Sequence, residues 1–178
     1  MKKIKVKDKE FEVFISSEKI VAAINTIAEQ LNRDLKGQRP VFLGVLNGSF
    51  MFAGDLFKKL DMDCEISFVK LASYSGTRTS SNVAELIGLS ETLMGRQVII
   101  LEDIIDTGIT IDYLIRKINE LGVSDLRIVT LFFKPDAFKK DFRIDYIGME
   151  IPNDFVVGYG LDYDGYGRNY AEIYKIVN

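Results

Sequence analysis

Apolar and polar residues follow two different periods along this chain, and the two periods predict strands and helices in alternation. Three stretches are mostly apolar, at 41–46, 98–101 and 126–133, as is typical of strands buried on both faces of a parallel sheet. Apolar residues at helical spacing predict amphipathic helices at about 17–35 and from 109 onward. Strands that alternate with helices indicate an α/β fold, with a central, mostly parallel, Rossmann-like sheet flanked by helices.

Shorter elements are predicted around this sheet. Strict alternation predicts a strand at 10–15, and an apolar stretch predicts a helix at 50–60. Further strands are expected at 64–71, at about 86–89 and at 155–159. Residues 72–83 are polar and form a long loop, and such loops in compact domains are often lids. We find no repeat or linker, so residues 1–178 are expected to form one domain.

Composition narrows the class of protein. The formal net charge of −3 argues against nucleic acid as the main partner. The chain has one cysteine, Cys64, and no apolar run long enough to cross a membrane, so we expect a cytoplasmic protein without a membrane partner. It contains no histidine, so acid–base chemistry falls to Asp, Glu, Lys, Tyr or Cys.

The stretch 98–110 carries the main candidate chemistry. Its apolar strand is followed at once by Glu102 and Asp103, then by Asp106 and the small-residue turn Thr107-Gly108-Ile109-Thr110. Backbone N–H groups of such a turn at a helix N-terminus can bind phosphate, and its glycine can take a positive φ. Carboxylates repel phosphate unless they bind sugar hydroxyls or Mg²⁺. A phosphorylated sugar with a divalent metal would therefore offer a binding partner to both the carboxylates and the turn of this stretch.

Simpler interpretations exist for the same residues. Acidic residues after a strand are often a solvated loop or a helix cap, but the full combination of strand, acidic loop, turn and helix favours a binding site. Adjacent strand residues face opposite sides, so Glu102 and Asp103 can both face a ligand only if the strand has broken, and we predict that it has. A second small-residue turn, at 47–49, is by itself typical of a tight strand-to-helix loop.

The acidic stretch resembles the phosphoribosyl pyrophosphate signature of the type I phosphoribosyltransferases. Its Glu-Asp-Ile-Ile-Asp-Thr-Gly form resembles the hypoxanthine–guanine branch in particular. Matching segments follow in the family's order from about residue 10 to 170, most specifically at 102–110 and 155–162. The resemblance implies that the phosphoribosyl part of the substrate binds Glu102, Asp103, Ile104, Asp106, Thr107, Gly108, Ile109 and Thr110.

The resemblance also implies a pyrophosphate loop and a lid. The loop corresponds to Leu46, Asn47, Gly48 and Ser49. The family often has Lys or Arg where this chain has Asn47, which removes a charge but leaves the backbone donors. Ser73 and Tyr74 resemble the Ser-Tyr pair of the family's mobile catalytic loop, which would exclude water. Arg168 would contact pyrophosphate.

A small purine hood is implied as well, built from roughly 1–15 and 146–178. Phe155 would stack on the base, and backbone groups at Val156 and Asp162 would bind the ring edge. Asp162 would also serve a second Mg²⁺.

The activity implied is Mg²⁺-dependent transfer of 5-phosphoribosyl from phosphoribosyl pyrophosphate to N9 of hypoxanthine or guanine, giving IMP or GMP and pyrophosphate in purine salvage. Glu102 and Asp103 would hold the ribose hydroxyls and, with Asp162, serve as metal ligands. Asp106 would be the acid–base group beside the base. Lys134 would donate to the exocyclic oxygen of a 6-oxopurine, where an amino group offers no acceptor. The family is commonly dimeric or tetrameric, so a homodimer or homotetramer is expected.

Three alternatives stay open. The enzyme could be specific for xanthine or adenine: Lys134 argues against adenine, whereas contacts near the 2-position of the base, which decide on xanthine, cannot be placed from sequence. A regulatory nucleotide- or RNA-binding protein on the same fold would need a basic face, which the net charge disfavours. A Rossmann-like sensor or response domain with an acidic Mg²⁺ pocket would explain the strand-end carboxylates. It would not explain the turn at 107–110 or the hood.

Overall fold

The computed structural model describes residues 2–73, 83–87 and 92–177. Within these residues, one sheet has six strands in the order β5-β4-β3-β6-β7-β8. Five of these strands run parallel, namely β4 (Glu65–Ser73), β3 (Val41–Leu46), β6 (Gln97–Ile105), β7 (Asp125–Phe133) and β8 (Tyr146–Glu150). The edge strand β5 (Val83–Ile87) is antiparallel to β4. The predicted α/β fold with a mostly parallel sheet is confirmed.

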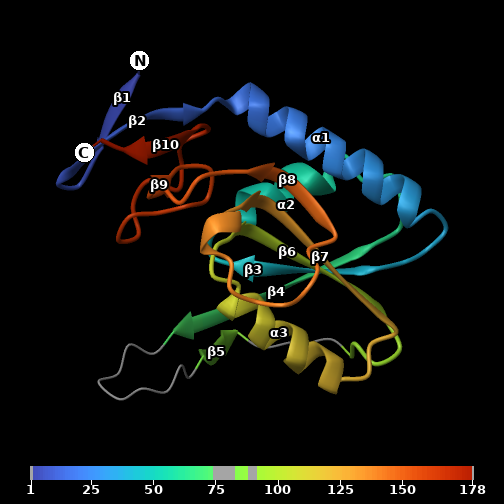
Figure 1. Ribbon diagram of the computed structural model, residues 1–178. Helices are drawn as coiled ribbons and strands as arrows, with labels where there is room; N and C mark the ends of the chain where they lie inside the picture. Colours follow the sequence, from blue (N-terminus) through green and yellow to red (C-terminus); the bar gives the residue numbers. More distant parts are fainter. Residues whose placement is uncertain (1, 74–82, 88–91, 178) are drawn as a thin grey trace.

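Helices cover both faces of this sheet, as Figure 1 shows. Helices α1 (Ser17–Asp34) and α2 (Phe50–Phe57) lie on one face, and α3 (Ile109–Glu120) lies on the other. Alternate residues of the strands divide between two cores: Phe42 and Ile99 pack with α1 and α2, whereas Leu43 and Ile100 pack with α3. Because both faces are buried, the central strands β3, β6 and β7 are mostly apolar along their length.

A second, four-stranded sheet has the order β1-β2-β10-β9 and is antiparallel throughout. It consists of β1 (Lys3–Val6), β2 (Lys9–Ile15), β9 (Val156–Val157) and β10 (Ile173–Ile176). This small sheet has its own apolar cluster around Phe11 and Tyr174, and it lies beyond the carboxyl end of β3 in Figure 1. Residues 146–150, which we expected in the hood, instead pair in parallel with β7 in the large sheet.

Several predicted boundaries change. Helix α2 ends at Phe57 rather than near residue 60, and β5 begins at Val83 rather than near residue 86. The strand predicted at 155–159 is reduced to β9, because Gly158, Tyr159 and Gly160 have positive φ angles that no strand can accommodate. A short 3-10 helix, η1 (Pro135–Ala137), follows β7. No helix among the described residues has the length and apolar character needed to span a membrane.

Candidate active site

Strand β6 continues through the two adjacent acidic residues, so the predicted break at Glu102 and Asp103 is wrong. Pairing with β3 ends at Leu101, but pairing with β7 persists to Ile105 and keeps the backbone extended. Neighbouring side chains on this continuous strand point to opposite sides. Glu102 lines a pocket and the carboxylate of Asp103 lies against Gly48. The two carboxyl groups nevertheless remain close enough at the end of the strand for each to shift the pKa of the other, so one ligand can reach both without a break in the strand.

Both carboxyl groups are buried at the end of β6. Glu102 is 8% exposed and Asp103 is 6% exposed. Burial, reinforced by the neighbouring Asp103 carboxylate, raises the pKa of Glu102 well above its usual value. Burial also raises the pKa of Asp103, although the amide of Ile104 donates to its Oδ1 atom at 2.8 Å and Arg168 adds a favourable charge. Two buried carboxyls this close favour a cation or hydroxyl donors as ligands.

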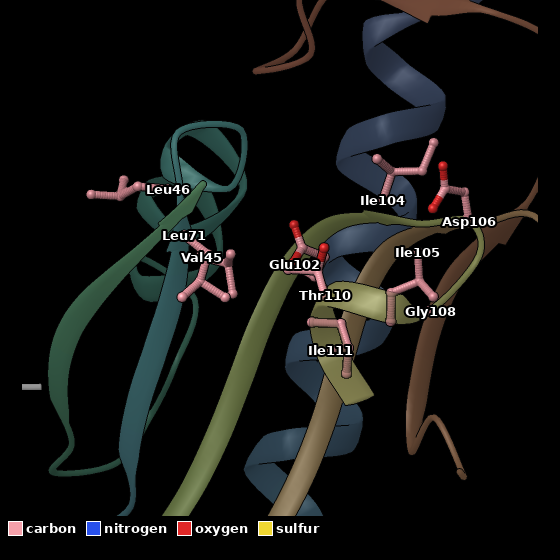
Figure 2. Close-up of a pocket in the computed structure, with 10 residues that line it drawn as sticks. All are labelled: Val45, Leu46, Leu71, Glu102, Ile104, Ile105, Asp106, Gly108, Thr110 and Ile111. Atoms are coloured by element: carbon pink, nitrogen blue, oxygen red, sulfur yellow. The ribbon is translucent and has the colours of Figure 1, made fainter. Parts of the chain in front are cut away.

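A pocket of about 220 Å³ opens at this edge of the sheet. Figure 2 shows Glu102 on β6 and Asp106 on the loop that follows it among the residues that surround the pocket. The lining consists of Val45, Leu46, Leu71, Glu102, Ile104, Ile105, Asp106, Gly108, Thr110 and Ile111. The structure thus brings six of the predicted substrate-binding residues together around one cavity, beyond the carboxyl ends of β3 and β6, where ligands bind in open α/β sheets.

The turn between β6 and α3 has the predicted shape. Gly108 has a φ of +79° and stands at the N-cap of α3, so the helix begins at Ile109. Its missing Cβ also matters, because a Cβ there would lie 2.6 Å from Cε2 of Phe138. The exposed Asp106 accepts a hydrogen bond from the backbone N–H of Thr107. The N–H groups of the first turn of α3 point to this loop, as anion binding requires.

The loop after β3 lies beside this pocket. Its Leu46–Asn47 peptide bond is cis. Ser49 is fully buried at the N-cap of α2, and its Oγ has no hydrogen-bond partner among the described residues. Gly48 is confined on two sides, because its own Cβ would overlap Asp103 and a Cβ at Gly160 would lie 2.0 Å from its carbonyl oxygen. The loop is therefore held between β6 and the small-sheet side of the molecule.

Lys134 lies at the end of β7, next to the acidic loop. Its backbone N–H donates to the carbonyl of Ile105 at 2.9 Å, and its Nζ donates to the carbonyl of Asp154 at 2.7 Å. Lys134 is 9% exposed, and burial lowers the pKa of its ammonium, against the charges of Asp106 and Asp154. Through its backbone N–H and its ammonium, Lys134 therefore links the end of β6 to the segment that precedes Phe155.

The aromatic residue predicted to stack on a base is half-exposed, and other aromatic rings pack against one side of it. Phe155 is 46% exposed. Its ring lies 5.8 Å from that of Tyr163 in an edge-to-face arrangement and 6.2 Å from that of Phe11. Val156 follows in β9 and is buried. One face of Phe155 is thus packed on the small sheet while its side chain keeps an accessible surface.

Asp162 and Arg168 are paired with each other. Nη2 of Arg168 lies 2.7 Å from Oδ1 of Asp162, and the backbone N–H of Gly165 donates to Oδ2 at 2.6 Å. Nη1 of Arg168 donates to the carbonyl of Gly160 at 2.6 Å. Within the described residues, no three His, Cys, Asp or Glu side chains come close enough together to hold a metal. Glu102, Asp103 and Asp162 therefore do not form a single three-carboxylate metal site.

Comparison with known proteins identifies the family to which a chain with these site residues belongs. Residues 15–164 match the model of the phosphoribosyl transferase domain. The chain belongs to the phosphoribosyl transferase family. It is 39% identical over 164 residues to a hypoxanthine-guanine phosphoribosyltransferase of Lactococcus lactis, an alignment that covers 91% of this chain and 89% of the relative.

Solved structures of the same family resemble the chain over almost its whole length. A hypoxanthine-guanine phosphoribosyltransferase of Bacillus anthracis superposes with a TM-score of 0.88 at 35% identity, covering 93% of this chain and 98% of the other. A hypoxanthine phosphoribosyltransferase of Trypanosoma cruzi in complex with the product IMP also has a TM-score of 0.88, at 32% identity, with 98% and 97% covered. The resemblance stated from the sequence motifs is confirmed.

Some expected site residues of this phosphoribosyl transferase lie outside the described structure. Ser73 ends β4, but its side chain and all of Tyr74 fall outside the described residues. The lid therefore stays a prediction. Conversely, sequence reasoning missed Asp55, Tyr159 and Gly160, which join the small-sheet side to α2 and to the loop at Gly48. The glycines on either side of Tyr159 were the available signal, because paired glycines mark unusual backbone conformations.

Proposed function

We propose that the chain transfers the 5-phosphoribosyl group from phosphoribosyl pyrophosphate to N9 of hypoxanthine or guanine, forming IMP or GMP and pyrophosphate. One observation carries the proposal. The buried Glu102 and the exposed Asp106 share a pocket with the turn at the N-terminus of α3, in a chain 39% identical to a relative named for this activity. A phosphorylated sugar needs these two kinds of group side by side, acceptors for hydroxyls and N–H donors for phosphate.

The substrate would bind along the carboxyl edge of the sheet. Glu102 and Asp103 would accept hydrogen bonds from the ribose hydroxyls, and the turn at 106–110 would bind the 5′-phosphate with its backbone N–H groups. The pyrophosphate would lie by the loop of Leu46, Asn47, Gly48 and Ser49, with Arg168 nearby. Supporting this placement, Gly48 lies against Asp103 and against Gly160, whose carbonyl accepts from Arg168.

The residues present fit a magnesium ion that is completed by substrate. Magnesium is usually held by one or two carboxylates together with substrate phosphates and water, and a pair of buried carboxyls is such a partial site. Glu102 and Asp103 would hold it through the ribose side. Asp162 is our candidate for a second ion, because each oxygen of its carboxylate keeps an unused lone pair beside its bonds to Arg168 and Gly165. Bound Mg²⁺ supplies positive charge that stabilises the leaving pyrophosphate.

The reaction breaks the bond between the anomeric carbon and pyrophosphate and forms a bond from that carbon to N9. Positive charge develops on the ribose, and the bonding electrons leave with pyrophosphate. Arg168 and the loop amides at 47–49 would stabilise the leaving charge. Asp106 would accept the proton at N7 of the base as N9 attacks, which neutralises the charge that bond formation places on the ring.

The base would be selected by groups at the end of β7 and in the small sheet. Lys134 would donate to the exocyclic oxygen at position 6, and Phe155 would stack on the ring with its accessible side. Backbone groups of Val156 and Asp162 would bind the ring edge. We further propose that residues 1–178 form one domain with the small sheet as its purine hood, that Ser73 and Tyr74 belong to a lid, and that the enzyme is a cytoplasmic homodimer or homotetramer.

The test is a spectrophotometric assay with phosphoribosyl pyrophosphate and Mg²⁺, run separately with hypoxanthine, guanine, xanthine and adenine. Turnover with hypoxanthine or guanine that stops on addition of EDTA and returns with excess Mg²⁺ is the expected result. Turnover with adenine alone would keep the fold and overturn the base assignment. Absence of turnover with all four bases would refute the proposed activity, and turnover mainly with xanthine would move the preference to that base.

A further inference from the structure

A buried tyrosine joins the small-sheet side of the molecule to helix α2. The hydroxyl of Tyr159 donates to Oδ2 of Asp55 at 2.5 Å, although the two residues are 104 positions apart. Tyr159 is 4% exposed, and Asp55 also lies 2.6 Å from Nζ of Lys58. Burial, and then the Asp55 carboxylate, raise the pKa of Tyr159, so the phenol stays protonated as a donor. Burial opposes ionisation of Asp55, but the bonds from Lys58 and Tyr159 lower its pKa overall.

The backbone around Tyr159 has an unusual shape that its neighbours maintain. Gly158, Tyr159 and Gly160 have φ angles of +104°, +45° and +96°, and a positive φ is rare for a bulky side chain. The N–H of Tyr159 donates to the carbonyl of Tyr170 at 2.8 Å, and the N–H of Gly160 donates to the carbonyl of Arg168 at 2.9 Å. The conformation is therefore stabilised by the surrounding bonds, and the side chain of Tyr159 anchors the turn to α2.

Both partners of this hydrogen bond are connected to parts of the proposed pyrophosphate site. Asp55 belongs to α2, whose N-terminus follows directly after Asn47, Gly48 and Ser49. Tyr159 precedes Gly160, which contacts Gly48 so closely that a Cβ would lie 2.0 Å from the Gly48 carbonyl oxygen. The carbonyl of the same Gly160 accepts from the guanidinium of Arg168 at 2.6 Å. A displacement of Tyr159 would therefore change the spacing between the loop and Arg168.

We propose that the Tyr159–Asp55 hydrogen bond is a positioning contact that holds Arg168 at a fixed spacing from the pyrophosphate loop. The proposal rests on the proposed function, and it makes Tyr159 a positioning residue that acts through Gly160 and touches no substrate. Loss of this hydrogen bond should weaken binding of phosphoribosyl pyrophosphate, because that ligand would contact both the loop at 47–49 and Arg168. Binding of the purine should change less, because Lys134 and Phe155 are held by other contacts and only Asp162, which pairs with Arg168, is shared between the two sites.

The chain contains a matched control. Tyr146 is also buried, at 6% exposure, and its hydroxyl also donates to an aspartate on a helix, Oδ2 of Asp34 at 3.1 Å. Asp34 is the last residue of α1 and Tyr146 the first of β8, at the amino ends of the strands and away from the proposed site. The Tyr146 hydroxyl also accepts from Nη1 of Arg127 at 3.0 Å. Tyr146→Phe therefore removes a buried, aspartate-bonded hydroxyl with one more bond than that of Tyr159, and it leaves the pyrophosphate loop unaltered.

The experiment compares wild-type protein with Tyr159→Phe, Asp55→Asn and Tyr146→Phe, each as the full chain. Initial rates are measured against phosphoribosyl pyrophosphate and against hypoxanthine, and melting temperatures are recorded for each variant. Tyr159→Phe should raise the KM for phosphoribosyl pyrophosphate roughly tenfold and change the KM for hypoxanthine much less. Asp55→Asn keeps an acceptor and should give a smaller rise. Tyr146→Phe should lower the melting temperature without changing either KM.

Three outcomes would overturn the proposal. They are unchanged KM values in Tyr159→Phe, equal rises in both KM values, and the same rise in Tyr146→Phe. If Tyr159→Phe does not fold, Asp55→Ala decides, because that variant removes the acceptor altogether and an unaltered KM for phosphoribosyl pyrophosphate in it would refute the contact. Absence of turnover in the wild type would refute the proposed function itself, whereas an active wild type with a normal Tyr159→Phe refutes the positioning role alone.

Discussion

The carboxylate of Asp103 lies so close to the α-carbon of Gly48 that a Cβ at Gly48 would lie 1.5 Å from Asp103 Oδ2. The two residues come from neighbouring strands of the sheet, Asp103 from the end of β6 and Gly48 from the loop after β3. Glycine is required here by space, because a Cβ atom cannot approach another heavy atom so closely. A proposed ribose ligand and the proposed pyrophosphate loop are thus in direct contact.

Gly48→Ala should therefore impair the enzyme strongly. The new methyl must displace either the Asp103 carboxylate or the loop, and a misplacement of about 1 Å in a substrate-positioning group costs roughly 100-fold in rate. We expect kcat/KM for phosphoribosyl pyrophosphate to fall by about that factor. Gly54→Ala, in α2, is the control, because, apart from its chain neighbours and the backbone of its own helix, no atom of the described residues lies within 4 Å of the place that its new methyl would take. Near-normal kinetics in Gly48→Ala would mean that the loop adapts freely and that the contact between Gly48 and Asp103 does not affect activity.

Asp106→Asn tests the acid–base assignment. Asp106 is exposed at the mouth of the pocket, so the amide should leave the fold intact. An amide cannot accept the base proton as a carboxylate does, and general acid–base assistance typically contributes about 10²–10⁴-fold. We expect kcat to fall by roughly that factor at an unchanged melting temperature. The exposed Asp141, changed to Asn, should behave as wild type, and an intact kcat in Asp106→Asn would remove Asp106 from the mechanism.

Lys134→Met tests selection of the base. The ammonium donates to the Asp154 carbonyl and lies near Asp106, so its loss removes both a donor for the 6-oxygen and a support for the segment before Phe155. Hydrogen bonds to charged groups contribute about 1.5–3 kcal/mol, so kcat/KM for hypoxanthine should fall about 10- to 100-fold. Steady-state assays with both substrates varied would measure this. Lys36→Met, at an exposed position after α1, is the control, and equal activity of the two variants would contradict the assignment.

The apolar pattern predicted the sheet well because burial on both faces leaves a clear signal. The strand at 41–46 was predicted with its exact bounds, and the positive φ of Gly108 followed from the turn chemistry alone. These features depend on residues close together in the chain. Local periodicity is enough to predict them, because they do not depend on contacts with distant parts of the chain.

The features that sequence reasoning missed depend on residues far apart. Strand β6 continues past Glu102 because β7 pairs with it up to Ile105, and no local pattern reports how far a neighbouring strand extends. The bond from Tyr159 to Asp55 joins positions 104 apart, and the ammonium of Lys134 is held by a carbonyl 20 positions away. Such partners become visible only when the fold brings them together.

Glu102→Gln should separate stability from activity at the same residue. Glu102 is 8% exposed next to the buried Asp103, and burial together with that neighbour opposes its ionisation. A neutral amide of the same shape removes this opposition, so the metal-free variant should be more stable by about 1 kcal/mol, which corresponds to about 2–4 °C in melting temperature for a chain of this size. The exposed Glu29, changed to Gln, should leave the melting temperature unaltered.

Activity should change in the opposite direction. The amide is a weaker acceptor for ribose hydroxyls and a poor ligand for Mg²⁺, so kcat/KM for phosphoribosyl pyrophosphate should fall at least tenfold while the melting temperature rises. Thermal melts in EDTA and steady-state assays in Mg²⁺ measure the two effects on one preparation. A variant that is both less stable and fully active would show that Glu102 is a structural carboxyl. A variant that is more stable and less active would show that the fold tolerates an unfavourable buried charge at this position because substrate binding requires it.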